Sequence, residues 1–393
     1  MRSFLTYEDL QGLRLLATDA ILGTTNVSEA LHQTIAGTAS PRKTPIPPIG
    51  GINRIVYKGV RNITKVASVG TSGLFRAMKL LPWDHHESRK RANFLAVING
   101  ICGDHLERTQ NPLALPMSFR MPDGELLGSG PLPLPQTKPN KLLIMVHGLC
   151  MSDLRWSRQG HNHGQKLAEE RQWPILYLNY NSGRHISKNG HEFANLLEKL
   201  LEGTPSPPDL NIICHSMGGL VLRSACNYAK NHNLSWIRSV ERIVFIGSPH
   251  HGAPLEGLGQ WADSLLTKSP FSAPFERLTS IRSDGINDLR FGSLVDADWA
   301  KRVPGKTSNL PRHIPLPEKI ACYSIAGTLA NASEKTHNRI LGDGLVPLNS
   351  ALGLHPDRTR CLDFMATRII QDTSHLRLLE SQKVYNQLEQ WLT

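Results

Sequence analysis

Residues 209–220 read DLNIICHSMGGL, and this stretch decides the predicted fold. Its first half, DLNIIC, is a continuous apolar run typical of a strand that is buried on both faces of a sheet. The segment that follows, MGGLVLRSACNYAKNH, has the apolar spacing of a helix. Ser216 falls at the junction, where the chain must turn sharply. Such a turn projects a serine side chain at the carboxyl edge of the sheet, where a nucleophile is expected.

Small residues around Ser216 matter because strand and helix approach each other closely at such a turn. In the pattern G-x-S-x-G, Gly218 supplies the second glycine and Gly219 adds room, but Cys214 stands in place of the first. Cys214 is small enough to be tolerated. We expect its thiol to be buried in the strand and therefore inert as a nucleophile. The plain alternative is that Ser216 only caps a helix, a position that serine favours.

Short apolar runs alternate with helical segments after residue 113, which predicts an α/β fold. The sheet should be mostly parallel, with helices on both faces. Around Pro-Asp-Gly, residues 117–121 and 125–127 predict a hairpin. The apolar runs that predict the other strands are Leu142–Val146, Ile175–Tyr180, Leu210–Cys214, Ile243–Ile246 and Ile320–Ile325.

The composition changes near residue 110, so we predict an N-terminal helical region over 1–110 and an α/β domain over 111–393. Apolar residues at helical spacing lie within 10–35, 52–67 and 92–106. A segment of about 255–316 is long for a connection between core strands. It is rich in large apolar residues and could form a lid over an acyl pocket. It could equally be a hydrophobic cluster beneath a loop.

A serine nucleophile needs a base, a carboxylate that orients the base, and donors for the oxyanion. Asp343 follows the apolar run ACYSIAG and sits in a tight D-G turn, which makes it the predicted acid. The chain order Ser–Asp–His leaves two histidines after this acid, His355 and His375. His355 precedes a proline in a loop, so His375 is the predicted base.

The oxyanion hole is predicted at two backbone amides. The run KLLIMV ends in HGLC, where Gly148 lets the chain turn and the N–H of Leu149 can point at a substrate oxygen. The second amide is that of Met217, at the start of the helix that follows Ser216.

These motifs together resemble the α/β-hydrolase superfamily of the lipase and esterase type. The run VFIGSPHHGAPLE is similar to the G-T-P-H-x-G-S run of bacterial lipases and of GPI-inositol-deacylase-like hydrolases. The segments EALHQTI, NGICGDHL and YNSGRHISKNG resemble a bacterial subgroup of these proteins. The resemblance covers about the last two thirds of the chain firmly and implies ester hydrolysis through an acyl-enzyme. Acyl transfer with the same residues, or a catalytically silent binding protein on this fold, remain alternatives.

Charge and cysteine content limit the binding partners and the cellular compartment that we expect. The formal net charge is +11, and residues 41–91 hold eleven Lys or Arg against two acidic residues. This stretch could contact an anionic membrane, although a solvated face is the plainer interpretation. No nucleic-acid signature, cofactor motif or metal-ligand spacing stands out, so we expect none of these partners. Six scattered cysteines, with no signal peptide or membrane span in the sequence, favour a cytoplasmic, reduced protein that acts on a small ester or lipid.

Overall fold

The computed structural model describes residues 5–38, 88–127, 140–254, 283–300, 310–330 and 342–393. These residues belong to two compact units, one formed by 1–91 with 106–114 and the other by 92–105 with 115–393. The predicted basic stretch 41–91 and the apolar residues of segment 255–282 lie largely or wholly outside the described residues. The proposed boundary near residue 110 stays a prediction.

The first unit contains the long helix α1 (Tyr7–Thr38), which continues through both apolar sets found in the sequence. Its start is a reciprocal cap: Thr6 Oγ1 accepts the Asp9 amide at 3.2 Å, and Asp9 Oδ2 accepts the Thr6 amide at 2.8 Å. The same buried carboxylate accepts hydrogen bonds from Nε and Nη2 of Arg91, at 2.6 and 2.9 Å. Two-pronged pairing of this kind fixes geometry as well as charge.

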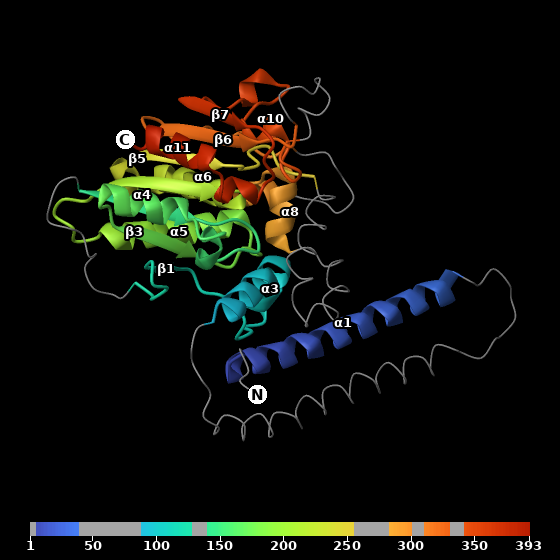
Figure 1. Ribbon diagram of the computed structural model, residues 1–393. Coiled ribbons are helices and arrows are strands. Elements are labelled where there is room, and N and C mark those ends of the chain that lie inside the picture. The colour runs from blue at the N-terminus through green and yellow to red at the C-terminus, as the bar shows by residue number, and fades with distance from the viewer. Residues whose placement is uncertain (1–4, 39–87, 128–139, 255–282, 301–309, 331–341) are drawn as a thin grey trace, which may run out of the picture. The chain divides into compact units, whose positions relative to one another are not determined.

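The second unit is built on a seven-stranded sheet in the order β1-β3-β2-β4-β5-β6-β7 (Figure 1). Only β1 runs antiparallel to its neighbour, β3. An antiparallel bridge between Arg120 and Leu126 confirms the predicted hairpin. The predicted α/β class, with a mostly parallel sheet, is also confirmed. The strands are β1 (Ser118–Arg120), β2 (Lys141–Val146), β3 (Ile175–Asn179), β4 (Asp209–His215), β5 (Val240–Ile246), β6 (Ala321–Gly327) and β7 (Ala366–Ile370).

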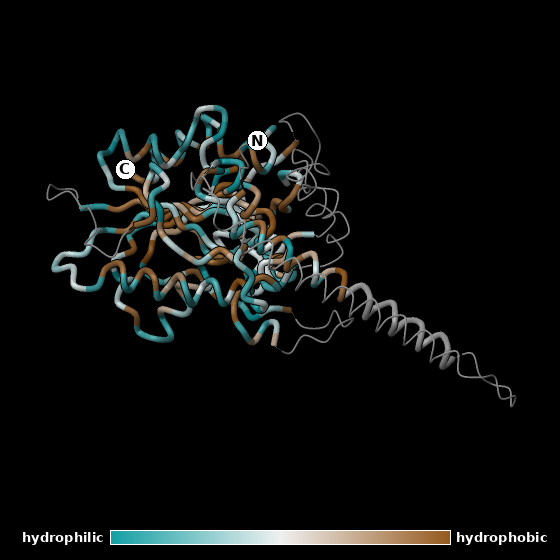
Figure 2. The backbone as a smooth tube through the Cα atoms, turned by 90° about the horizontal axis from the view of Figure 1, so that it is seen from below, coloured by the Kyte–Doolittle hydropathy of each residue, from teal (hydrophilic) through white to brown (hydrophobic). Residues whose placement is uncertain are grey.

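Helices cover both faces of this sheet, which explains why its central strands are apolar on both sides. One face carries α4 (His163–Arg171) and α11 (Gln382–Trp391), whose apolar residues share one buried cluster with alternate residues of the strands. On the other side α5 (Ile186–Leu201) packs against α6 (Met217–His232), and α6 contacts β2 and β4. The strands form the apolar interior in Figure 2.

The remaining helices are α3 (Arg89–Arg108), which is kinked at Cys102, α8 (Asp284–Phe291), α9 (Asp296–Trp299) and α10 (Leu348–Ala351). Helix α8 falls inside the predicted insertion and is tied to the start of α5. His185 Nδ1 lies 2.8 Å from Asp288 Oδ2, which also accepts the Ile186 amide at 3.1 Å. The described part of the insertion is therefore anchored to the sheet's helical layer.

Candidate active site

The backbone at Ser216 has φ 54° and ψ −126°, in the turn between β4 and α6. A serine with positive φ is uncommon, and such strain is often found where a side chain must be presented for chemistry. The turn is tied to the end of β5, because the Ser216 amide donates to the Ile246 carbonyl at 2.9 Å. Ser216 is 5% exposed. It is thus a strained, nearly buried serine at the carboxyl edge of a parallel sheet.

The glycines around the turn are required by close backbone contacts. A Cβ added at Gly218 would lie 2.5 Å from the carbonyl oxygens of both Val146 and His147. One added at Gly148 would lie 2.9 Å from the Cβ of Ser216. Cys214, which stands in place of the first glycine of the pattern, lies fully buried on β4, between β2 and β5. Burial raises the pKa of its thiol well above the ordinary value, so it stays protonated and unreactive.

The predicted acid and base lie side by side. His375 Nδ1 is 2.7 Å from Asp343 Oδ2, and the His375 amide also donates to the Asp343 carbonyl at 3.0 Å. The other carboxylate oxygen, Oδ1, accepts the amides of Leu345 and Val346 at 3.0 and 2.8 Å. These donors fix the carboxylate in one orientation, so the imidazole carries its proton on Nδ1 and presents Nε2 as an acceptor.

His375 Nε2 has no hydrogen-bond partner among the described residues. The ring nonetheless fits closely between two neighbours. The His215 ring packs against it with centroids 4.6 Å apart, and Gly247 leaves room at its edge, since an added Cβ there would lie 3.2 Å from His375 Cε1. A buried, oriented imidazole with one free nitrogen is what a general base requires.

The rival histidine lies elsewhere. His355 is in the loop after α10, where its Nδ1 accepts the Asp357 amide at 3.0 Å and its ring contacts His251 at 5.0 Å between centroids. Asp343 therefore pairs with His375 and not with His355. Three other aspartates, Asp284, Asp296 and Asp298, lie within the predicted insertion, in α8 and α9.

Among the described residues, neither of the two predicted oxyanion donors, the Leu149 and Met217 amides, donates a backbone hydrogen bond. Met217 is the first residue of α6, so its amide is one of the donors that a helix start leaves free. Both residues are buried, at 3% and 0% exposure.

Support for the Leu149 loop comes from residues that the sequence did not single out. The Tyr180 hydroxyl donates to the His147 carbonyl at 2.8 Å, and its ring stacks on the His147 imidazole with centroids 4.4 Å apart. Ser182 Oγ accepts the Cys150 amide at 3.0 Å. The signal was the YNSG run, which begins at the end of the predicted strand Ile175–Tyr180.

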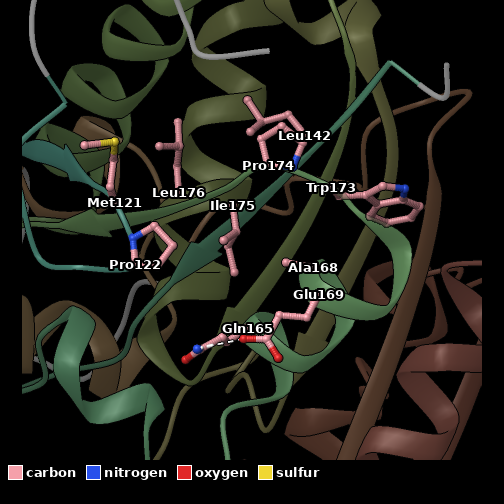
Figure 3. Close-up of a pocket in the computed structure, with 10 residues that line it drawn as sticks. All are labelled: Met121, Pro122, Leu142, Gln165, Ala168, Glu169, Trp173, Pro174, Ile175 and Leu176. Atoms are coloured by element: carbon pink, nitrogen blue, oxygen red, sulfur yellow. Dashed lines mark hydrogen bonds between the residues drawn. The ribbon is translucent and has the colours of Figure 1, made fainter. Parts of the chain in front are cut away.

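An apolar cavity lies at the edge of the sheet opposite to Ser216, so it cannot serve this site. It has a volume of about 360 Å³ and is lined by Trp173, Pro174 and Ile175, among others (Figure 3). Trp173 and Pro174 directly precede β3, Ile175 is its first residue, and Leu142 contributes from the start of β2. Ser216 follows the end of β4, and parallel strands end at the same edge, so cavity and serine lie at opposite edges of the sheet.

A mostly parallel sheet with a strand–turn–helix at Ser216 defines an α/β-hydrolase-like fold. Residues 126–271 match a family whose description is "Domain of unknown function (DUF7379)". No curated protein matches the chain significantly.

Solved structures similar to the chain include hydrolases of two kinds. A Bacillus licheniformis lipase in mature form is 19% identical with a TM-score of 0.42, covering 66% of this chain and 96% of its own. Staphylococcus hyicus lipase is 13% identical with a TM-score of 0.37, covering 66% and 97%. YbtT, a type II thioesterase from the yersiniabactin biosynthetic pathway, is 14% identical with a TM-score of 0.36, covering 66% and 94%. All three likenesses are distant, so the roles of individual residues are argued from this chain alone.

Proposed function

We propose that the protein is a serine hydrolase that cleaves carboxylic esters through an acyl-enzyme. The observation that carries the proposal is the 2.7 Å contact between His375 Nδ1 and Asp343 Oδ2, combined with a free Nε2. Ser216, in its strained turn, is the proposed nucleophile. A silent binding protein would have no need to hold a buried carboxylate with two amides and to leave the partner imidazole nitrogen open.

The proposed reaction follows from the proton positions. His375 Nε2 takes the proton of Ser216 Oγ as the oxygen attacks the ester carbonyl, and Asp343 stabilises the imidazolium that forms. The amides of Leu149 and Met217 donate to the oxyanion, and loss of one such donor typically costs about 3 kcal/mol of barrier. His375 then protonates the leaving alcohol. In the second half it activates water, which releases the acid and restores Ser216.

Labelling with a fluorophosphonate probe tests this proposal. The wild-type chain should be labelled and Ser216→Ala should not. Ser206→Ala serves as the matched control, since this exposed loop serine lies outside the site, and it should label like the wild type. An unlabelled wild type, or a labelled Ser216→Ala, would show that Ser216 is not the nucleophile.

The class of substrate is a finer proposal, namely a lipid-like ester. It rests on the apolar composition of 255–316 and on the basic stretch 41–91. No described helix is both long and apolar enough to cross a membrane. A chain-length series of nitrophenyl esters, with vesicle flotation on anionic lipid at low salt, tests this preference. Product analysis with added alcohols separates hydrolysis from acyl transfer.

A further inference from the structure

A second site is indicated by a small cavity lined by arginines and histidines beside α6. The cavity has a volume of about 40 Å³. One water needs about 10–15 Å³, so the cavity admits one compact group and excludes an extended ligand. Its cationic or ionisable lining comes from α6, from the chain after β5, from residues 312–313 and from the region after α10: Arg223, His250, His251, Arg312, His313, His355 and Arg360. No described residue of the lining is acidic.

Arg223 carries a buried charge that carbonyls satisfy only in part. It is 4% exposed, and its Nη1 donates to the His250 carbonyl at 3.4 Å, while Nη2 donates to the Ile314 carbonyl. None of the ion pairs within the described residues involves it. Burial lowers the pKa of its guanidinium to about 10, so it remains charged at neutral pH. A buried charge without a counter-charge is costly.

Three of the unpaired polar atoms at the cavity are donors, and a fourth is His251 Nε2. Arg223 Nη1 lies 3.5 Å from His250 Nδ1, and since an arginine can only donate, Nδ1 accepts and the neutral ring carries its proton on Nε2. This Nε2–H is buried and has no acceptor among the described residues. The Nε–H groups of Arg223 and Arg360 likewise have no described acceptor. A group that accepts several hydrogen bonds and carries negative charge would complement these donors.

Two histidines of the lining are kept neutral by burial and by the nearby arginines. Burial and then Arg223 lower the pKa of His250 well below its ordinary value. The pKa of His251 is lowered to about 4 by burial, with Arg223 and Arg360 acting in the same direction. Neutral histidines leave the arginine charge uncompensated. Among the described residues, no group of three or more His, Cys, Asp or Glu side chains is placed to hold a metal ion.

We infer that this cavity is a binding site for a compact oxyanion of the phosphate or sulfate kind. Charge-assisted hydrogen bonds from a guanidinium are the strong ones in anion recognition. Donors converge from separate segments, which suits a tetrahedral anion better than a planar one. The inference does not depend on the proposed hydrolase activity, since none of the lining residues belongs to the proposed triad or oxyanion hole.

Calorimetric titration of the full chain with sodium sulfate and with inorganic phosphate, at constant ionic strength set by sodium chloride, tests the inference. We expect one saturable site per chain. Arg360→Gln should weaken binding about tenfold or more, because it removes a charged donor. Arg171→Gln, the same change on α4, should bind like the wild type. Arg223 is buried and its loss threatens folding, so His313→Gln at the partly exposed side of the cavity is the second variant, and it should also weaken binding.

Two results would overturn the site: no saturable binding to the wild type, or equal affinities for Arg360→Gln and the wild type. A third arm separates the sources of the anion. Tighter binding of glycerol 3-phosphate than of inorganic phosphate would support the site as one for a phosphate monoester. Equal or weaker binding would support it as one for the free anion.

Discussion

His375 and Asp343 are joined twice, through the imidazole Nδ1 and carboxylate Oδ2 at 2.7 Å and through the His375 amide and the Asp343 carbonyl at 3.0 Å. The backbone bond fixes the two loops, and the side-chain bond fixes the imidazole tautomer. The two amides on Oδ1 prevent the carboxylate from rotating. The pair is thus pre-organised by the fold and does not depend on a substrate to form.

The proton on His375 Nδ1 determines the expected effect of Asp343→Asn. An amide can donate to Nδ1 and place the imidazole proton on Nε2, where it blocks proton transfer from Ser216. We expect kcat for ester hydrolysis to fall by about 10⁴-fold with little change in KM. Asp372→Asn, an exposed aspartate in the neighbouring turn, is the control and should leave kcat unchanged. A loss of less than tenfold in Asp343→Asn would contradict the orienting role.

Gly218→Ala is predicted to destabilise the nucleophile turn. In a free helix this change would gain about 1 kcal/mol, but here the new Cβ would meet two carbonyl oxygens at 2.5 Å. Overpacking of this kind costs about 1–3 kcal/mol. We expect a loss of this size in the free energy of unfolding, which urea unfolding measures. At Gly203 an added Cβ meets nothing within 4 Å and φ is +72°. Gly203→Ala therefore reports backbone strain alone. Equal stability of Gly218→Ala and the wild type would show that the contacts relax freely.

Cys214 offers a graded test of the same crowding. Cys214→Gly should keep activity, because the turn normally accepts glycine there. Cys214→Leu adds volume at a fully buried position and should cost about 1–3 kcal/mol of stability or disturb the Ser216 turn. Thermal unfolding and ester hydrolysis together check both variants. Full activity and stability of the leucine variant would mean that the site has spare room.

The buried strands were predictable because a strand covered on both faces is mostly apolar, as in the runs Leu142–Val146 of β2 and Ile212–Cys214 of β4. Strand β7 was missed for the opposite reason. It is an edge strand in which three consecutive residues, Thr367 to Ile369, are exposed, so its sequence lacks a continuous apolar run.

Within the site, chain order and local motifs predicted which acid and histidine meet. They could not predict what supports them. The ring of His215 beneath His375, and the Tyr180 hydroxyl on the His147 carbonyl, join residues far apart in the chain. Neither contact leaves a pattern in the spacing of residues. Only the packed structure brings such side chains together.

Tyr180→Phe tests how much the hydrogen bond from Tyr180 to the His147 carbonyl contributes to stability and to kcat. The change keeps the ring that stacks on His147 but removes the donor to its carbonyl, leaving a buried acceptor unpaired. We expect a loss of about 1–3 kcal/mol in the free energy of unfolding. If the carbonyl anchors the Leu149 amide, kcat should fall and KM should change little. Tyr228→Phe, on the outer part of α6, is the control. An unchanged kcat with lowered stability would limit Tyr180 to a structural role.

Buried neutral histidines predict that the protein loses stability in acid. Burial lowers the pKa of His147 and of His163 to about 4. The unfolded chain binds protons at these positions near pH 6.5, whereas the folded chain does not until about pH 4. The stabilisation is therefore complete above pH 6.5 and is lost as pH falls from 6.5 to 4, by up to about 3 kcal/mol for each residue.

Urea unfolding at pH 8, 6.5, 5 and 4 measures this loss. His163→Gln should flatten the curve, because it removes a buried ring that the fold keeps neutral. Its Nε2 donates to the Leu378 carbonyl at 2.9 Å, so its Nδ1, 2.7 Å from His161 Nε2, is an acceptor that a second proton would block. His232→Gln, an exposed position, should leave the pH dependence unchanged. A wild-type stability that stays level between pH 6.5 and 4 would mean that these rings gain protons without unfolding, and that the buried sites are better solvated than their packing indicates.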